Sequence, residues 1–146
     1  MSNISLAQAT RIVDHAILTG REKKLQPLAV VVLDTAGKIV VLKREDNTSL
    51  LRNDVAEAKA AACLGMGFGG RELDRRGKAN PAFFASLAAL AGGGFMPFPG
   101  GVLIRGDAGE LLGAVGISGD TGANDELCAV AGIRAAGLVP DTGDPA

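Results

Sequence analysis

Residues 92–125 read GGGFMPFPGGVLIRGDAGELLGAVGISGDTGAND, and this stretch decides how the chain folds. It contains eleven glycines in 34 positions and two apolar runs, 101–105 and 110–118, on either side of the glycine-containing segment 106–109. Two such runs around a turn predict a β-hairpin. Because glycine permits positive φ and a close approach to the backbone, we also expect sharp turns, exposed backbone, or both.

Two interpretations of these glycines stand. In the first, they only close tight turns. In the second, Gly92-Gly93-Gly94 and Ser118-Gly119-Asp120 form the walls of a ligand pocket, because loops that join rigid elements often carry binding residues. Both interpretations require a sheet that the rest of the chain must supply.

A second hairpin is predicted upstream. Residues 28–33 (LAVVVL) and 38–43 (KIVVLK) are β-branched apolar runs, and the segment 34–37 (DTAG) supplies the Asp and Gly that a tight turn favours. The second run ends in the charged segment 44–47, REDN. That segment is either a solvated loop or a binding loop in which the Arg44 guanidinium grips a carboxylate with two hydrogen bonds.

Helical periodicity and capping residues predict helices around the two hairpins. Ser5 and Gln8 form a capping box for the first helix, and Pro81 takes the first helical position of another. We assign Asn53 or a neighbour as the cap of the second helix and Asn124 as the cap of the last. The predicted helices cover residues 6–23, 54–64, 81–91 and 125–136.

The order of these elements gives the fold class. A helix, a hairpin, two helices, a hairpin and a final helix predict an α+β domain with an antiparallel sheet and helices packed on it. The 146 residues suffice for a single domain, 1–146. One turn of helix is expected at 71–76, and residues 138–146 are expected to be frayed.

Composition argues against several classes of function. The chain carries a formal charge of −1, no basic run and only 3% aromatic residues, which argues against a surface for nucleic acid. No apolar run reaches the roughly 18 residues that span a bilayer. The N-terminus shows no export signal, so we expect a cytoplasmic protein that does not contact membranes.

Few side chains suit a metal or a cofactor. Cys63 and Cys128 lack the spacing of a zinc site, so we expect no metal centre and interpret both as small core residues. His15, the only histidine, is either solvated on the polar face of its helix or an axial haem ligand. Lys59 either covers apolar surface with its stem or faces an anion at a pocket rim.

Four segments of the chain resemble one known family. In order, they are LAVVVLDTAGKIVVLKRED (28–46), AEAKAAACLG (56–65), GGGFMPFPGGVLI (92–104) and LLGAVGISGDTGANDELCAVAGI (111–133). They are similar to the valine-rich hairpin with Arg-x-Asp, the Lys-Ala helix, the Gly-Gly-x-Pro loop and the Gly-Val-Ser-Gly finish of the GlcG/HbpS-like (DUF336, "haem-degrading") family. The resemblance runs from about residue 4 to residue 137.

The resemblance implies an antiparallel sheet of about five strands flanked by helices in a profilin-like layout, in the order α-β-β-α-α-β-β(-β)-α. It also implies dimers or larger homo-oligomers. No axial haem ligand is shared across the family, so none carries over. The loop of this chain has Phe95-Met96 before its proline, one residue more than the simplest motif. The ligand-binding candidates are Arg44, Asp46, Lys59, Gly93, Gly94, Phe95, Met96, Pro97, Ser118, Gly119 and Asp125.

The first functional hypothesis is a small-molecule binding protein, accessory to a catabolic or redox pathway, with haem as one candidate ligand. Its pocket would form between the glycine loop, the Arg44 loop and the start of the last helix, whose free N–H groups suit a carboxylate. If haem binds, the iron ligand would be His15, a thiol, Met66 or Met96.

Two alternatives remain. One is a cofactor-independent enzyme, an isomerase, tautomerase or hydrolase, in which Arg44 or Lys59 holds a carboxylated substrate and Asp120 or Asp125 moves a proton. The other is an oligomeric accessory subunit that associates through its alanine-rich helices and the apolar loop 94–101.

Overall fold

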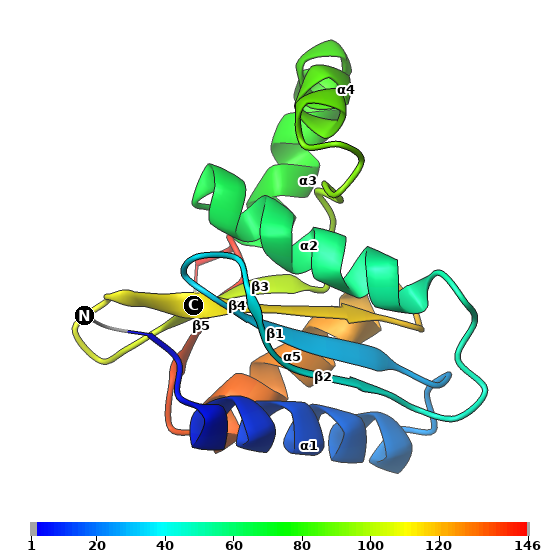
Figure 1. Ribbon diagram of the computed structural model, residues 1–146, viewed down its shortest axis with the longest axis vertical. Helices are drawn as coiled ribbons and strands as arrows, with labels where there is room; N and C mark the ends of the chain where they lie inside the picture. The colour runs from blue at the N-terminus through cyan, green and yellow to red at the C-terminus, as the bar shows by residue number, and fades with distance from the viewer. Residues whose placement is uncertain (1–2, 146) are drawn as a thin grey trace.

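The chain folds into three layers, with one antiparallel sheet between two layers of helices (Figure 1). The computed structural model describes residues 3–145. Its elements are α1 (Leu6–Glu22), β1 (Ala29–Asp34), β2 (Ile39–Arg44), α2 (Arg52–Met66), α3 (Gly70–Ala79), α4 (Pro81–Leu90), β3 (Gly101–Arg105), β4 (Leu111–Ser118), α5 (Gly122–Ala135) and β5 (Val139–Asp141). The strand order is β2-β1-β4-β3-β5, and every neighbouring pair is antiparallel.

The helices divide unequally between the two faces of the sheet. Helices α1 and α5 cover one face, α2 covers the other, and α3 and α4 continue outward from α2 (Figure 1). The predicted fold class, sheet and element order are confirmed, with α3 as a full helix where a single turn was expected. Across residues 3–145, none of the helices has the length and apolar character needed to cross a bilayer.

Apolar side chains form a separate core on each face of the sheet. The inner strand β1, which lies between β2 and β4, is buried throughout residues 29–33. Its residues alternate between the two cores, with Val30 and Val32 in the α1 and α5 layer and Val31 in the α2 layer. Because both faces are covered, the strand reads as a continuous apolar run instead of an alternating one.

The prediction of a frayed C-terminal tail was wrong. Residues 139–141 form β5, which pairs with 103–105 of β3, and Arg105 Nε lies 2.8 Å from Asp141 Oδ2. The chain beyond β5 is also held, because Arg71 N donates to Thr142 O at 2.9 Å. Without β5, the edge of β3 would expose unpaired backbone groups. Pairing with β3 therefore orders residues 139–141, although their sequence shows no strand periodicity.

Helix α2 lies directly against the sheet at Gly116, where a Cβ atom would overlap the carbonyl oxygen of Ala56. We expect Gly116→Ala to push α2 away from β4 and to lower the free energy of unfolding by about 1–3 kcal/mol, measured by urea denaturation. Gly65→Ala is the control, because a Cβ at this α2 position meets nothing within 4 Å. Equal effects of the two substitutions would contradict the prediction.

Candidate functional site

A buried ion pair joins α2, β4 and α5 at one end of the sheet. Lys59 Nζ lies 3.3 Å from Asp125 Oδ2 and donates to Ile117 O at 2.9 Å. Lys59 is only 6% exposed, and Asp125 is fully buried. The sequence places the lysine here because Ala56 and Cys63, three residues before it and four after it on α2, belong to the core on this face of the sheet.

Burial moves both members of this pair toward their neutral forms. Desolvation lowers the pKa of the Lys59 ammonium, and the attraction of Asp125 offsets this only in part. Desolvation likewise raises the pKa of the Asp125 carboxyl, against the opposing effects of Lys59 and of the Asp120 backbone N–H. The pair therefore connects three elements while both charges bear a desolvation cost.

The two candidate proton-transfer groups, Asp120 and Asp125, are both engaged by the protein. Asp125 Oδ1 accepts a hydrogen bond from Asp120 N at 3.0 Å, and Oδ2 faces the ammonium described above. Asp120 Oδ1 accepts from Gln26 N, and Oδ2 accepts from Thr121 N and Asn124 Nδ2. This geometry favours a structural role for both carboxylates in the turn between β4 and α5.

These hydrogen bonds lower the pKa of Asp120, and the Gln26 N–H contributes most. A carboxylate with a lowered folded pKa stabilises the fold above its unfolded pKa of about 3.9, and this contribution is lost as the pH falls through the folded value. We therefore expect Asp120→Asn to lower the urea midpoint at pH 7, with a difference that shrinks below about pH 4. A difference independent of pH would contradict the assignment.

Ser118 and Arg52 complete this end of the sheet. Arg52 Nη1 donates to the hydroxyl of the fully buried Ser118 at 3.0 Å, and Gly119 follows in the turn that leads to α5. Four of the predicted site residues therefore lie in one region of the structure, namely Lys59, Ser118, Gly119 and Asp125. Sequence reasoning missed Arg52, which lies outside the segments that carry the family resemblance.

Neither Asn53 nor Asn124 caps its helix. Helix α2 has Leu51 at its N-cap, without a side-chain hydrogen bond, and Asn53 lies inside the helix with a buried, unpaired Oδ1. Helix α5 is capped by Thr121, whose hydroxyl accepts from Asn124 N. Both helices begin earlier than the apolar periodicity indicated, because their first turns carry polar residues.

Arg44 and Asp46 lie apart from the buried pair, and both side chains are exposed. Arg44 pairs with Ala29 of β1, which pairs in turn with Ser118 of β4. Residues directly opposite one another point to the same face of a sheet, so Arg44 lies on the α2 side, two strands or about 10 Å from Ser118.

The glycine loop lies along the outer side of α2. Gly93 has a φ of 89°, and with Gly94 it lines a hollow of about 380 Å³ together with the acidic residues Asp54 and Glu57. Acidic walls of this kind do not suit an anionic ligand such as a carboxylate.

The remainder of the loop points in other directions. Phe95 is buried, with its ring centroid 5.8 Å from that of Phe84, and Met96 N donates to Ala58 O at 3.2 Å. Pro97 lines a separate hollow of about 390 Å³. The predicted loop residues therefore lie in several environments and do not face one shared cavity.

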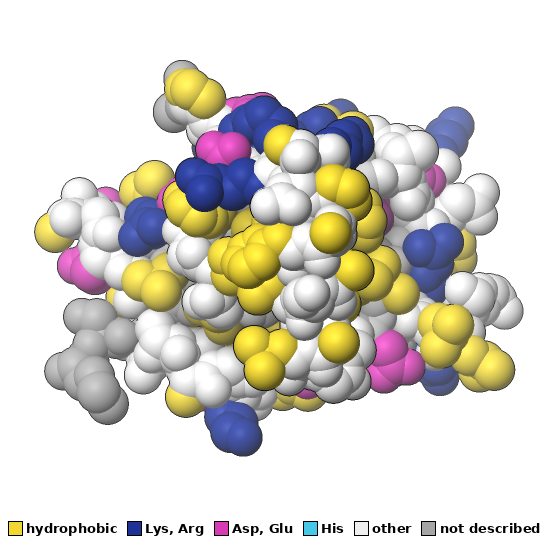
Figure 2. Space-filling model, turned by 90° about the horizontal axis from the view of Figure 1, so that it is seen from above, with side chains coloured by type: hydrophobic (Ala, Val, Ile, Leu, Met, Phe, Trp, Pro, Cys, Tyr) yellow, Lys and Arg dark blue, Asp and Glu magenta, His cyan; other side chains and the backbone are white. Residues whose placement is uncertain are grey.

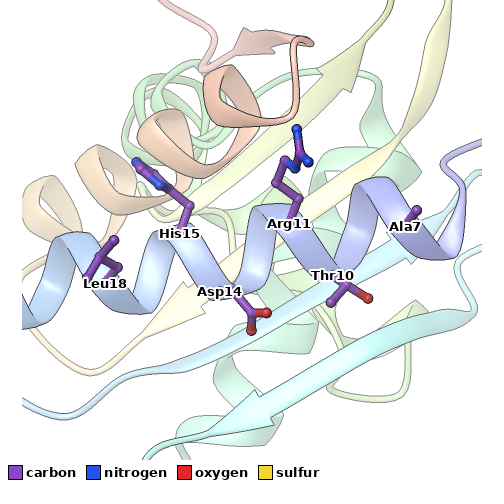
Figure 3. A pocket seen from close by; sticks show the side chains of 6 residues that line it. All are labelled: Ala7, Thr10, Arg11, Asp14, His15 and Leu18. Atoms are coloured by element: carbon purple, nitrogen blue, oxygen red, sulfur yellow. The ribbon is translucent and has the colours of Figure 1, made fainter.

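His15 lines a hollow on the outer side of α1, with a volume of about 440 Å³ (Figure 3). His15 and Arg11, one helical turn apart, point to the same side of the helix, and Asp14 and Thr10 point to the other (Figure 3). Asp14 Oδ1 lies 2.7 Å from Lys43 Nζ of β2. The imidazole thus shares its side of the helix with a guanidinium and not with a carboxylate.

A second hollow, of about 510 Å³, is lined by the C-terminal end of α1, by α5 and by Arg71 of α3, and it shares no lining residue with the first. Thr19 lines it and donates to His15 O at 2.9 Å, one turn away. Its apolar wall comes from α5 and includes Leu127 and Val130. Cations surround this wall, namely Lys23, Arg134 and Arg71, the last paired with Glu126 at 2.8 Å.

Both cysteines are core residues, as predicted. Burial raises the pKa of the Cys63 thiol to about 12 and that of Cys128 to about 11. We expect neither thiol to react with a thiol reagent in the native protein and both to react after unfolding in urea. The absorbance of the reagent gives the number of thiols that have reacted. Labelling of the native protein within seconds would contradict this. Among residues 3–145, no group of three His, Cys, Asp or Glu side chains is placed to hold a metal ion.

The chain belongs to the family described as haem-degrading protein HbpS-like, whose model matches residues 4–134. No curated protein matches the chain. Three solved structures share the fold. A PduOC–haem complex is 24% identical, with a TM-score of 0.84 over 97% of this chain and 99% of that one. The DUF336 protein ORFY of Klebsiella pneumoniae is 21% identical, with a TM-score of 0.85 over 94% of this chain and 92% of that one, and HbpS is 24% identical, with a TM-score of 0.80 over 92% and 90%. At these identities, the similarity establishes the fold.

Proposed function

We propose that this protein binds haem between α1 and α5, with His15 as the iron ligand. The observation that carries the proposal is that the only imidazole of the chain lines a surface hollow beside a cation, next to an apolar hollow ringed by cations. Membership of a family described as haem-degrading supports it, as does the fold shared with the haem complex of PduOC.

Three groups of side chains support a haem site here. The porphyrin needs an apolar surface, which Leu127 and Val130 of α5 provide. The propionates need cations, and Arg11 and Arg134 are exposed on this side of the molecule. The iron needs a nitrogen or sulfur ligand, and the half-buried His15 supplies a nitrogen. Bound haem would supply an iron centre for redox chemistry, in keeping with an accessory role in a catabolic or redox pathway.

The test is a titration of the purified protein with haemin, followed by absorbance. We expect a Soret band that shifts and saturates near one haem per chain, or one per dimer if two copies share it. The spectrum should show imidazole ligation in the reduced and oxidised states. A Soret band that never saturates would refute haem binding by this protein.

A further inference from the structure

An apolar hollow of about 390 Å³ is lined by α3, α4 and the loop before β3. Its apolar walls come from Pro81, Phe84, Ala85, Pro97 and Phe98. Figure 2 looks onto this end of the molecule and shows hydrophobic side chains gathered in the middle of the face, with charged side chains mainly at its margin. Sites for small molecules have volumes of about 300–1,000 Å³ and mostly apolar walls with a few polar groups. The hollow therefore has the size and character of a small-molecule site.

The Phe84 ring forms a fixed wall of this hollow. Phe84 is only 7% exposed, and its ring centroid lies 6.0 Å from that of Phe83 and 5.8 Å from that of Phe95. Helix α3 also packs closely against this ring, because a Cβ atom on Gly77 would come within 3.2 Å of it. Aromatic rings attract one another in offset or edge-to-face contacts. A flat ligand ring can thus pack on an aromatic side chain whose position the protein already fixes.

One carboxylate lines the same hollow. The Asp74 side chain is only 21% exposed, whereas its ion-pair partner Lys78, 3.1 Å away and one turn along α3, is 77% exposed. An exposed pair with this spacing adds little to stability, so the lysine can leave the carboxylate readily. Residues 79–104 contain no charged side chain, and α4 and the loop therefore offer Asp74 no other cation.

We infer that this hollow binds a small aromatic amine. The ring of the ligand packs against Phe84 and Pro97, and its ammonium replaces that of Lys78 on Asp74 through a charge-assisted hydrogen bond. An apolar cavity of about 150 Å³ holds a benzene ring, so a hollow of about 390 Å³ has room for a ring and a short arm that carries the amine. An anionic ligand fits less well, because Asp74 would repel it.

This inference does not depend on haem binding. The hollow shares no lining residue with the two hollows that α1 lines. The aromatic amine site and the proposed haem site can therefore be tested separately, and the failure of one leaves the other standing.

Titration of the isotope-labelled protein with phenethylamine, followed by two-dimensional NMR, tests the site. We expect saturable shifts in the amide signals of α3, α4 and the loop around Pro97, with a dissociation constant of about 1 mM or lower for a ligand of this size. Phenylacetate, which carries the opposite charge, and phenethyl alcohol, which carries none, should each bind at least about tenfold more weakly. Equal binding of all three compounds would overturn the inference, as would shifts that do not saturate or that centre on another part of the chain.

Two variants locate the amine and the ring. Asp74→Asn should weaken phenethylamine binding at least about tenfold and remove its advantage over phenethyl alcohol. Glu72→Gln is the matched control, because this carboxylate of α3 pairs with two arginines at 3.3 and 3.8 Å and does not line the hollow. Ala85→Leu should block the hollow, whereas Ala82→Leu, at an exposed α4 position outside it, should leave binding unchanged. Undiminished binding in Asp74→Asn or Ala85→Leu would overturn the inference.

Discussion

Replacing Lys59 with Met is expected to lower the free energy of unfolding by about 3–5 kcal/mol, because it leaves the fully buried Asp125 without its cation. The methionine fills a similar volume, so the loss measures the missing charge and not a cavity. Urea denaturation at pH 7, followed by circular dichroism, measures the effect. Protonation of Asp125, whose pKa burial already raises, would bring the cost toward the lower end of this range.

Two controls separate this effect from the loss of any lysine. Lys43→Met removes an exposed partner from the 2.7 Å pair with Asp14 and should cost no more than about 1 kcal/mol. The double variant Lys59→Met/Asp125→Leu removes both buried charges and should recover much of the stability lost in Lys59→Met. A Lys59→Met protein as stable as Lys43→Met would show that the buried pair does not hold α2, β4 and α5 together.

Replacing His15 with Ala is expected to remove imidazole ligation and to weaken haem binding at least about a hundredfold, since loss of even a supporting partner of a metal ligand costs 10–100-fold. The fold should survive, because His15 is only half-buried at the surface of α1. Titration of the variant with haemin, followed in the Soret region, measures the change. Its thermal melting temperature should stay close to that of the native protein.

Two neighbouring positions on α1 serve as controls. Arg11→Ala removes a cation on the same side of the helix (Figure 3) and should weaken binding while the Soret band keeps its position. Asp14→Ala removes a carboxylate that also lines this hollow but points to the other side of the helix (Figure 3), so the Soret band should again keep its position. A His15→Ala variant that keeps the native spectrum would keep haem as the ligand and exclude this histidine. The ligand would then be sought among Met66, Met96 and the thiols.

Much of the fold could be predicted from signals a few residues apart. The turn residues Asp34 and Gly37 specified the first hairpin, where Asp34 Oδ1 accepts from the N–H groups of residues 36 and 38. The capping box of Ser5 and Gln8 marked the start of α1, as both of its hydrogen bonds show. Local hydrogen bonds of this kind need no distant partner, so the sequence alone determined the element order and the fold class.

The tertiary structure decided the rest, because the decisive contacts join residues that are far apart in the chain. Lys59 and Asp125 are separated by 66 positions, and neither residue's neighbours indicate that both are buried. Arg52 and Ser118, which form a hydrogen bond, are also 66 positions apart in the chain. Strand β5 exists only because β3 offers it an open edge. Burial, pairing and pKa shifts depend on what surrounds a side chain in space, and that becomes fixed only when the layers pack.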